Sequence, residues 1–190
     1  MSKRRRVDYA LTGGSGDVNP QFYSGEGGTG EESNYAATSA YISPVSRGLP
    51  APRGKAVVME VLKIFVDLPD YEALTSTAVA NRARFISFST RDLGAGFVKL
   101  SDPTVFAKYA DEQVYAFTAA GTVCSFQPST ISLDLTDGAG HGILIATDYI
   151  YVQYNTTQFG AANVPFYWKI LYRFKTVALT EYIGIVQSQS

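Results

Sequence analysis

The sequence predicts an all-β fold, a single antiparallel sandwich with a flexible N-terminal arm. Tyr and Phe are abundant, with 13 and 11 copies among 190 residues, and with Val, Ile and Thr they suit a pleated, half-buried surface. About eight short apolar runs follow one another with turn signals between them, and one weak helical pattern interrupts them. An eight-stranded jelly roll fits this pattern, because folding two sheets together protects their edges.

The N-terminal third predicts the arm, residues 1–54, ahead of a sandwich domain in residues 55–190. The stretch from Gly13 to Gly30 contains seven glycines and cannot bury enough surface to offset the entropy lost on ordering. Aromatic residues are spaced through the predicted arm. They either lie along an inner wall or a neighbouring subunit, or are isolated side chains. They are Tyr9, Phe22, Tyr23, Tyr35 and Tyr41.

The first strands are predicted from β-rich and alternating runs. Lys55–Asp67 is the first of them, although Glu60 and Lys63 interrupt its alternation and leave a helix as the alternative. Asn81–Arg91 alternates well and predicts a second strand. Asp102–Glu112 opens with Asp-Pro-Thr and continues with apolar residues at helical spacing, which predicts a short helix or an irregular excursion.

The next elements are short strands joined by turns. Gln113–Thr118 and Thr122–Gln127 flank an Ala-Ala-Gly turn and predict a hairpin. Thr130–Leu135 alternates and stops at a Gly-rich turn. Ile143–Tyr154 predicts two strand segments or one bent strand, and a polar loop over 155–163 follows it.

The last quarter of the chain contains two aromatic and β-branched stretches. Phe166–Lys175 predicts a strand, and Val177–Val186 either extends it past a bend or pairs at a subunit contact. An end this apolar has to be paired and covered, since it would otherwise be an adhesive edge. The pattern therefore favours assembly over catalysis. The candidate interface residues are Tyr182, Ile183, Ile185 and Val186.

Residues that support catalysis are scarce. The single histidine, His141, lies in a Gly-rich turn far from the single cysteine, Cys124, so the two cannot form a zinc site. No nucleophile motif occurs. We therefore expect no enzyme activity, no cofactor and no metal. One cysteine excludes an internal disulfide and fits a reducing compartment, and no stretch is long and apolar enough to cross a membrane.

Positive charge is concentrated at the N-terminus, although the whole chain has a net charge of −1. This basic tip, at residues 3–6, could bind phosphate groups and release their counterions, and it is short enough for a nuclear import receptor to recognise. The alternative is that it only makes the end of the chain more soluble. Residues 1–54 have six basic and five acidic groups, so DNA binding would require many copies acting together. The tip consists of Lys3, Arg4, Arg5 and Arg6.

Two further basic stripes lie on predicted strands, one with Arg82 and Arg84 and the other with Lys169 and Arg173. Aromatic residues interleave with them and could stack nucleic-acid bases. Aromatic residues on a sandwich strand more often fill the core. The stripes are therefore candidate nucleic-acid contacts, and the alternative is that their aromatic residues belong to the core.

The C-terminal sequence resembles that of coat proteins from small circular, Rep-encoding single-stranded DNA (CRESS-DNA) viruses. The runs Phe166–Lys175 and Leu179–Gln189 look like the end of such capsid proteins, and Gly142–Asp148 is similar to their preceding strand. This resemblance covers roughly residues 140–190. The rest of the chain is similar only in its general organisation, with a basic tip, a flexible arm and Tyr/Phe-rich strands.

The resemblance implies an eight-stranded jelly roll whose identical copies, about sixty in the simplest closed shell, form an icosahedral virion around single-stranded DNA. It also implies an arm that faces the genome and entry into the host nucleus through an import receptor. The arm departs from the family, whose arms are often long and rich in arginine. The alternative function is a β-sandwich module that binds carbohydrate or protein.

Overall fold

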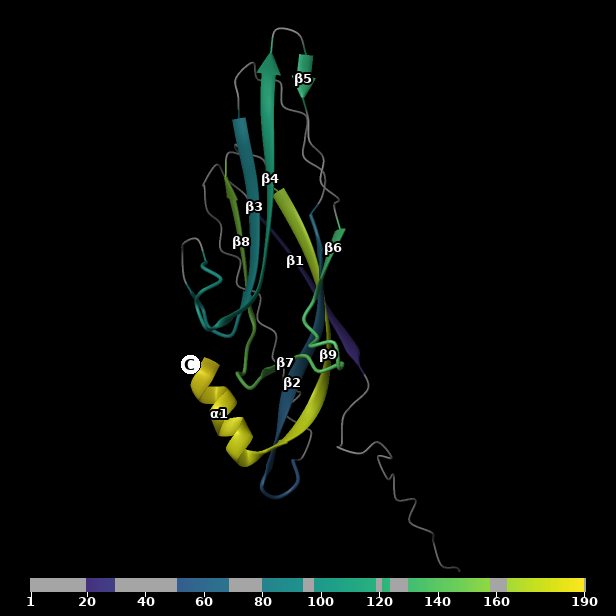
Figure 1. Cartoon of the computed structure of the whole chain (residues 1–190), viewed down its shortest axis with the longest axis vertical. Helices are drawn as coiled ribbons and strands as arrows, with labels where there is room; N and C mark the ends of the chain where they lie inside the picture. The colour runs from purple at the N-terminus through teal and green to yellow at the C-terminus, as the bar shows by residue number, and fades with distance from the viewer. Residues whose placement is uncertain are drawn as a thin grey trace, which may run out of the picture.

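The computed structural model describes residues 20–29, 51–68, 80–93, 98–118, 121–123, 130–157 and 164–189. Two antiparallel sheets face each other across a core, and a helix at the C-terminus lies beside their lower end (Figure 1). The first sheet has the order β1-β9-β2-β6, with a short β7 paired to β2. Its strands are β1 (Gln21–Thr29), β9 (Val164–Ala178), β2 (Lys55–Asp67), β6 (Thr130–Asp134) and β7 (Ile143–Ile145).

The second sheet has the order β5-β4-β3-β8, so eight strands lie on the two paths. Its strands are β5 (Gly121–Val123), β4 (Val105–Thr118), β3 (Ala80–Ser89) and β8 (Tyr151–Thr157). Within the described residues, β1 pairs with β9, the last strand, and the chain passes between the sheets from β2 to β3, from β5 to β6 and from β7 through β8 to β9. Such crossing connections make the fold a jelly roll, and they confirm the predicted all-β sandwich.

Aromatic side chains join the two sheets. Tyr154 of β8 stacks on Phe166 of β9 with ring centroids 4.1 Å apart. Phe88 of β3 meets Trp168 of β9 edge-on at 6.2 Å. The aliphatic core, including Ile64 of β2, packs around these rings. The aromatic content that predicted strands therefore fills the space between the layers.

The structure corrects the arm prediction. Gln21–Thr29, inside the range 1–54, is strand β1 and pairs with β9 over nine positions. Glycine is favoured at position 25 of this strand, because a Cβ there would lie 2.4 Å from the Trp168 ring. Residues 1–19 and 30–50 lie outside the described residues, so the arm itself and the division at residue 54 stay predictions.

The structure also corrects the helix or irregular excursion predicted for Asp102–Glu112. The Asp102 carboxylate accepts hydrogen bonds from the Thr104 amide at 2.9 Å and the Thr104 hydroxyl at 2.6 Å. This local turn uses the Asp-Pro-Thr signal, and β4 begins directly after it at Val105. The predicted hairpin is present as far as the structure describes it, since Ala116–Thr118 of β4 pair with Gly121–Val123 of β5, and residues 124–127 of its second strand lie outside the described residues.

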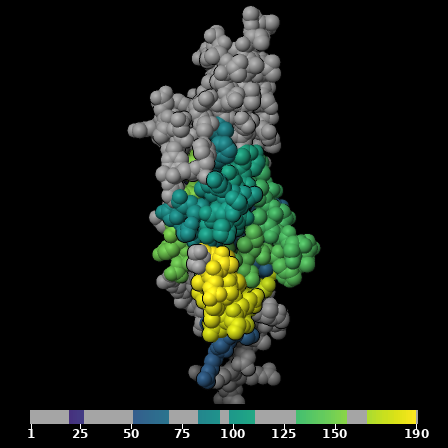
Figure 2. Space-filling model, turned by 60° about the vertical axis from the view of Figure 1, so that its left-hand side comes forward, coloured from purple at the N-terminus to yellow at the C-terminus, as the bar shows by residue number. Residues whose placement is uncertain are grey.

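The second C-terminal stretch is a helix, α1 (Leu179–Gln189), and the prediction of a strand there is wrong. Figure 2 shows α1 on the molecular surface. Its half-buried residues recur at helical spacing, and Gln189 fastens its end to the sandwich. The Gln189 side chain donates to the Leu144 carbonyl and accepts from the Ala146 amide at 3.0 Å, while its main-chain carbonyl accepts from the Thr90 hydroxyl at 3.2 Å. The half-buried residues are Tyr182, Ile185, Val186 and Gln189.

The remaining strand predictions agree with the structure. Lys55–Asp67 is strand β2 with those bounds, and Thr130–Asp134 is β6. Asn81–Arg91 corresponds to β3, and Ile143–Tyr154 contains two strands rather than one bent strand. The second of these, β8, continues to Thr157, so the loop predicted over 155–163 is wrong at its first three residues, and 158–163 lie outside the described residues. No helix among the described residues is long and apolar enough to span a membrane.

Candidate functional site

The outer face of the β1-β9-β2-β6 sheet has the most distinctive chemistry of the described residues. Alternation along β9 buries Phe166, Trp168 and Ile170 and turns Tyr167 and Lys169 outward. In β2 the register shifts between Val61 and Lys63, so one extra residue is inserted at this point. The shift divides the outer face into two halves with different chemistry.

We call the part beyond the shift the open half. Its side chains form three cross-strand rows, in which a residue of β9 lies between one of β1 and one of β2. The rows are Glu26–Tyr167–Asp67, then Ser24–Lys169–Phe65, then Phe22–Leu171–Lys63.

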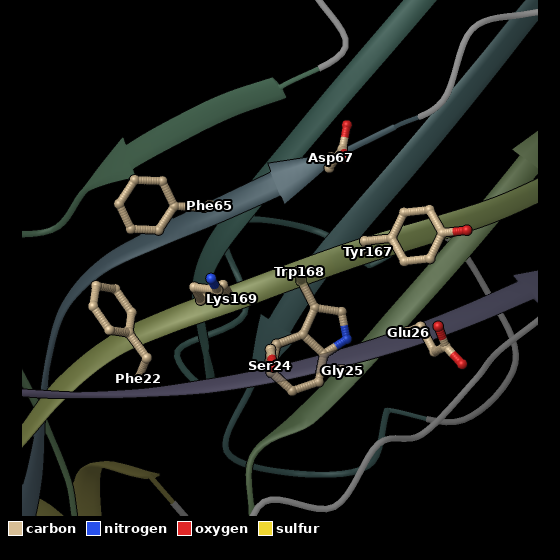
Figure 3. A pocket seen from close by; sticks show the side chains of 9 residues that line it. All are labelled: Phe22, Ser24, Gly25, Glu26, Phe65, Asp67, Tyr167, Trp168 and Lys169. Atoms are coloured by element: carbon tan, nitrogen blue, oxygen red, sulfur yellow. The ribbon is translucent and has the colours of Figure 1, made fainter.

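The open half is hollowed, with a volume of about 700 Å³ (Figure 3). Phe22 is 60% exposed, and its ring lies 6.3 Å from that of Phe65 at an angle of 50°. The Lys169 ammonium lies 5.4 Å from the centre of the Phe22 ring, and Lys63 lies 5.7 Å from that of Phe65. One end of the hollow therefore combines two aromatic rings with one lining cation, Lys169, and a second cation, Lys63, lies beside it.

The other end of the hollow is acidic. Tyr167, which is 40% exposed, lies between Glu26 of β1 and Asp67 of β2 in the cross-strand row. Figure 3 shows these three side chains apart from Phe22 and Phe65. The hollow is thus electrically polarised along β9, from a cationic end to an anionic end.

The chain's single tryptophan, the buried Trp168, also lines the hollow. Its ring packs across β1 at Gly25 and stacks with Tyr23 at 5.6 Å. Trp168 is buried, and among the described residues its indole Nε1 has no hydrogen-bond partner. Figure 3 shows this nitrogen on the side of the ring nearer Glu26.

We call the part of the face before the shift the covered half, because the segment 135–142 lies over it. The Glu60 carboxylate is fully buried there and accepts hydrogen bonds from the Arg173 guanidinium and from the Gly142 amide at 3.0 Å. The Lys175 ammonium lies 3.5 Å from the same carboxylate. Burial alone would raise the pKa of Glu60, but the Arg173 and Gly142 hydrogen bonds and the Lys175 charge together hold that pKa below its usual value.

The covering segment is stabilised by its own turn. Asp137 accepts hydrogen bonds from the amides of Ala139 and His141, at 2.9 and 3.0 Å, and contacts the His141 ring at 3.0 Å. The hydrogen bonds from His141 lower the pKa of Asp137 to about 2. The main chain and the ring of His141 therefore hold this turn together.

The structure separates the four basic stripe residues that the sequence grouped. Lys169 lies in the hollow, whereas Arg173 pairs with Glu60 in the covered half. Arg84 of β3 is only 3% exposed and is a core residue rather than a surface contact. Arg82 lies on β3, and its side chain is outside the described residues, as is the whole basic tip from Lys3 to Arg6.

The candidate interface residues all lie on α1, but they do not share one face. Ile183 is 49% exposed and, with Leu179 at 48%, projects away from the sandwich. Tyr182, Ile185 and Val186 are half-buried against the sandwich. Within the part of the chain that the structure describes, no group of acidic, histidine or cysteine side chains could hold a metal ion.

Sequence reasoning missed Phe22, Phe65 and Lys63 as site residues. Phe22 was placed in the arm and Phe65 in an apolar run, although Phe65 alternates with the buried Ile64 and Val66 on β2. The alternation after Lys63 would have shown Phe65 and Asp67 on one face. The pairing of β1 with β9, which brings Phe22 beside Lys169, has no local signal because these residues are far apart in the sequence.

No known protein family's profile matches the chain, and no curated protein matches it. Among solved structures, VP1 of Trichodysplasia spinulosa-associated polyomavirus in complex with 3'-sialyllactose has 11% identity and a TM-score of 0.49, over 88% of this chain and 97% of that one. A human polyomavirus 7 VP1 pentamer has 10% identity and a TM-score of 0.48, over 82% and 95% of the two chains. An unassembled Washington University polyomavirus VP1 pentamer has 9% identity and a TM-score of 0.47, over 83% and 93%. The strand order of this chain, rather than these overlaps, defines its fold.

Proposed function

We propose that this protein is the structural subunit of a small icosahedral virus capsid. The observation that carries the proposal is the strand order, in which β9 joins β1 to β2 within a two-sheet jelly roll. Jelly rolls of this kind occur in capsid proteins, and also in lectin domains and cupins. The resemblance of residues 140–190 to CRESS-DNA coat proteins favours the capsid.

In this function, about sixty identical copies close into a shell around a circular single-stranded DNA genome. The basic tip, Lys3 to Arg6, contacts the DNA phosphates and serves for nuclear import, so the protein is found in the host nucleus during assembly and in the virion afterwards. Because the tip has four cations, its contribution depends on many copies acting together.

Helix α1 is the proposed subunit contact. Leu179 and Ile183 are one turn apart on its exposed side, and burial of this pair against a neighbouring subunit would remove apolar surface from water. Tyr182, Ile185 and Val186 support the contact from behind by fixing the helix on the sandwich.

Electron microscopy of the purified full-length chain tests the proposal. We expect closed shells of uniform diameter, and a stable monomer at high concentration would overturn the function. Replacement of Leu179 and Ile183 by Ser should impair assembly, whereas Thr180→Ala with Gln187→Ala, at exposed polar positions of α1, should not. Deletion of residues 3–6 should leave shells that protect less DNA from nuclease.

A second candidate is a carbohydrate-binding module. The row Glu26–Tyr167–Asp67 favours it, because carboxylates beside an exposed aromatic ring can accept hydrogen bonds from sugar hydroxyls. This function predicts a monomer or small oligomer, and loss of binding when Tyr167 is replaced by Ala. Deletion of the basic tip would leave it unchanged.

A further inference from the structure

We propose that the end of the hollow lined by Phe22, Phe65 and Lys169, with Lys63 beside it, is a stacking site for single-stranded nucleic acid. This inference rests on the proposed function, since it names the ligand of one surface of the capsid subunit. It differs from the basic tip in chemistry, because the tip offers charge alone while this surface offers rings as well.

Two phenylalanine rings lie on the open sheet face, where Phe22 is exposed and Phe65 is half-buried. An edge strand and its second neighbour contribute one phenylalanine each, and the two rings lie 6.3 Å apart over β9. Phe22 is 60% exposed, although burying such a ring normally stabilises a protein. Aromatic rings on an open sheet face are suited to stack bases without regard to sequence.

Two cations lie beside these rings. Lys169 and Lys63 each have their ammonium group within 6 Å of a phenylalanine ring. A nucleotide that stacks on either ring would therefore have a cation near its phosphate. A neutral sugar could accept hydrogen bonds from these ammonium groups but would gain no charge–charge attraction from them.

The hollow is also electrically polarised. Glu26 and Asp67 lie in the cross-strand row around Tyr167, away from Phe22, and they would repel phosphate. A polyanion would therefore follow the Phe22 end of the hollow. The proposed nucleic-acid site is therefore confined to the Phe22 end. Tyr167 lies in the same hollow but at the acidic end, so a substitution of Tyr167 is a control for substitutions of Phe22 and Phe65.

Trp168 provides a reporter at the site. It is the chain's single tryptophan, it lines the hollow, and its indole Nε1 has no partner among the described residues. A strand that enters the hollow should change the emission of Trp168, whereas a strand held by the basic tip alone should not.

The test compares binding of two single strands by the full-length chain, one an oligothymidylate and the other an abasic deoxyribose-phosphate oligomer of the same length. We expect the wild-type chain to prefer the oligomer with bases and to change its Trp168 emission on binding. Phe22→Leu and Phe65→Leu keep apolar packing but remove a ring, and each should reduce this preference roughly fivefold or more. Lys169→Gln should weaken binding of both oligomers and reduce the salt dependence by about 0.7 in logarithmic slope.

Two controls separate the site from its surroundings. Tyr149, 42% exposed in the segment before β8, matches Tyr167 in exposure, and Tyr149→Ala should leave the preference unchanged. Deletion of residues 3–6 should weaken binding of both oligomers equally and preserve their ratio.

The inference is overturned if Phe22→Leu and Phe65→Leu keep the wild-type preference, or if Tyr167→Ala removes it. Shells that still form in these variants keep the capsid function separate, so that failure of the stacking site and failure of assembly give different results.

Discussion

The two halves of the outer face of the β1-β9-β2-β6 sheet use lysine and arginine side chains in different roles. In the covered half, Arg173 and Lys175 of β9 converge on buried Glu60, and segment 135–142 closes over them. In the open half, Lys169 of the same strand lies over the exposed ring of Phe22. The charge of a β9 cation therefore does not reveal its role, because the coverage of its neighbourhood decides it.

The insertion in β2 creates this difference. Before it, the outward residue is Glu60, which needs cations and an amide to compensate its burial. After it, the outward residues are Lys63, Phe65 and Asp67, which remain accessible to a ligand. Three experiments test whether the covered half is structural and the open half is not.

The largest expected effect is on the buried carboxylate. Glu60→Gln leaves Arg173 and Lys175 without their counterion and should lower the free energy of unfolding by about 3 kcal/mol. Asp67→Asn, at an exposed carboxylate of the open half, should change it by less than about 0.5 kcal/mol. Urea unfolding followed by Trp168 fluorescence measures both, and equal losses would remove the distinction between the halves.

Glycine substitutions in the covered and the open half test the same difference, with smaller expected changes in stability. A Cβ at Gly142 would lie 2.1 Å from the Val61 carbonyl oxygen, so Gly142→Ala should lift the covering segment and cost about 2 kcal/mol. A Cβ at Gly25 meets the Trp168 ring instead of backbone, so Gly25→Ala should cost less and shift the tryptophan emission.

Gly184 of α1 is the control for these two substitutions, because no atom lies within 4 Å of its added Cβ. Gly184→Ala should raise the free energy of unfolding by about 0.5 kcal/mol, since alanine loses less backbone entropy in a helix. A loss of stability at Gly184 equal to that at Gly142 would mean that contact with neighbouring atoms does not determine these effects.

The sequence was sufficient for elements whose pattern is local. β2 was predicted with its observed bounds, since the β-branched run Lys55–Asp67 ends at Leu-Pro-Asp. α1 was missed because β-branched residues suggested a strand, while the 3.6-residue spacing of Tyr182, Ile185, Val186 and Gln189 went unused. Hydrogen bonds from Gln189 to distant backbone then hold the helix, and no local pattern encodes those.

The candidate site depended on long-range pairing. Lys169 was identified, but Arg173 was grouped with it because charge spacing along a strand does not show that Glu60 lies opposite. Arg84 was grouped with them for the same reason, although it is buried. The partner strand β1 escaped prediction because its glycines, one of which makes room for Trp168, resemble those of a linker.

The smallest expected effect is a pH dependence of the covering segment. The pKa of Asp137 is lowered from 3.8 to about 2 by its hydrogen bonds with His141. A carboxyl group whose pKa is lower in the folded state stabilises that state above its unfolded pKa, and it loses this contribution as the pH falls from about 4 to about 2. Glu60, whose pKa is also lowered, acts in the same direction.

Asp137→Asn removes one titrating group and leaves an amide oxygen that can still accept the two backbone hydrogen bonds. The unfolding midpoint in urea should therefore fall less steeply for this variant than for the wild type as the pH decreases through that range. Because Glu60, Asp102 and Asp134, whose pKa values are also lowered, still titrate in the variant, some pH dependence should remain, and Glu60→Gln should remove only the part that Glu60 contributes. Parallel pH profiles for wild type and Asp137→Asn would show that the turn at His141 does not contribute to holding the covered half closed, and the stability of that half would then rest on the Glu60 cluster alone.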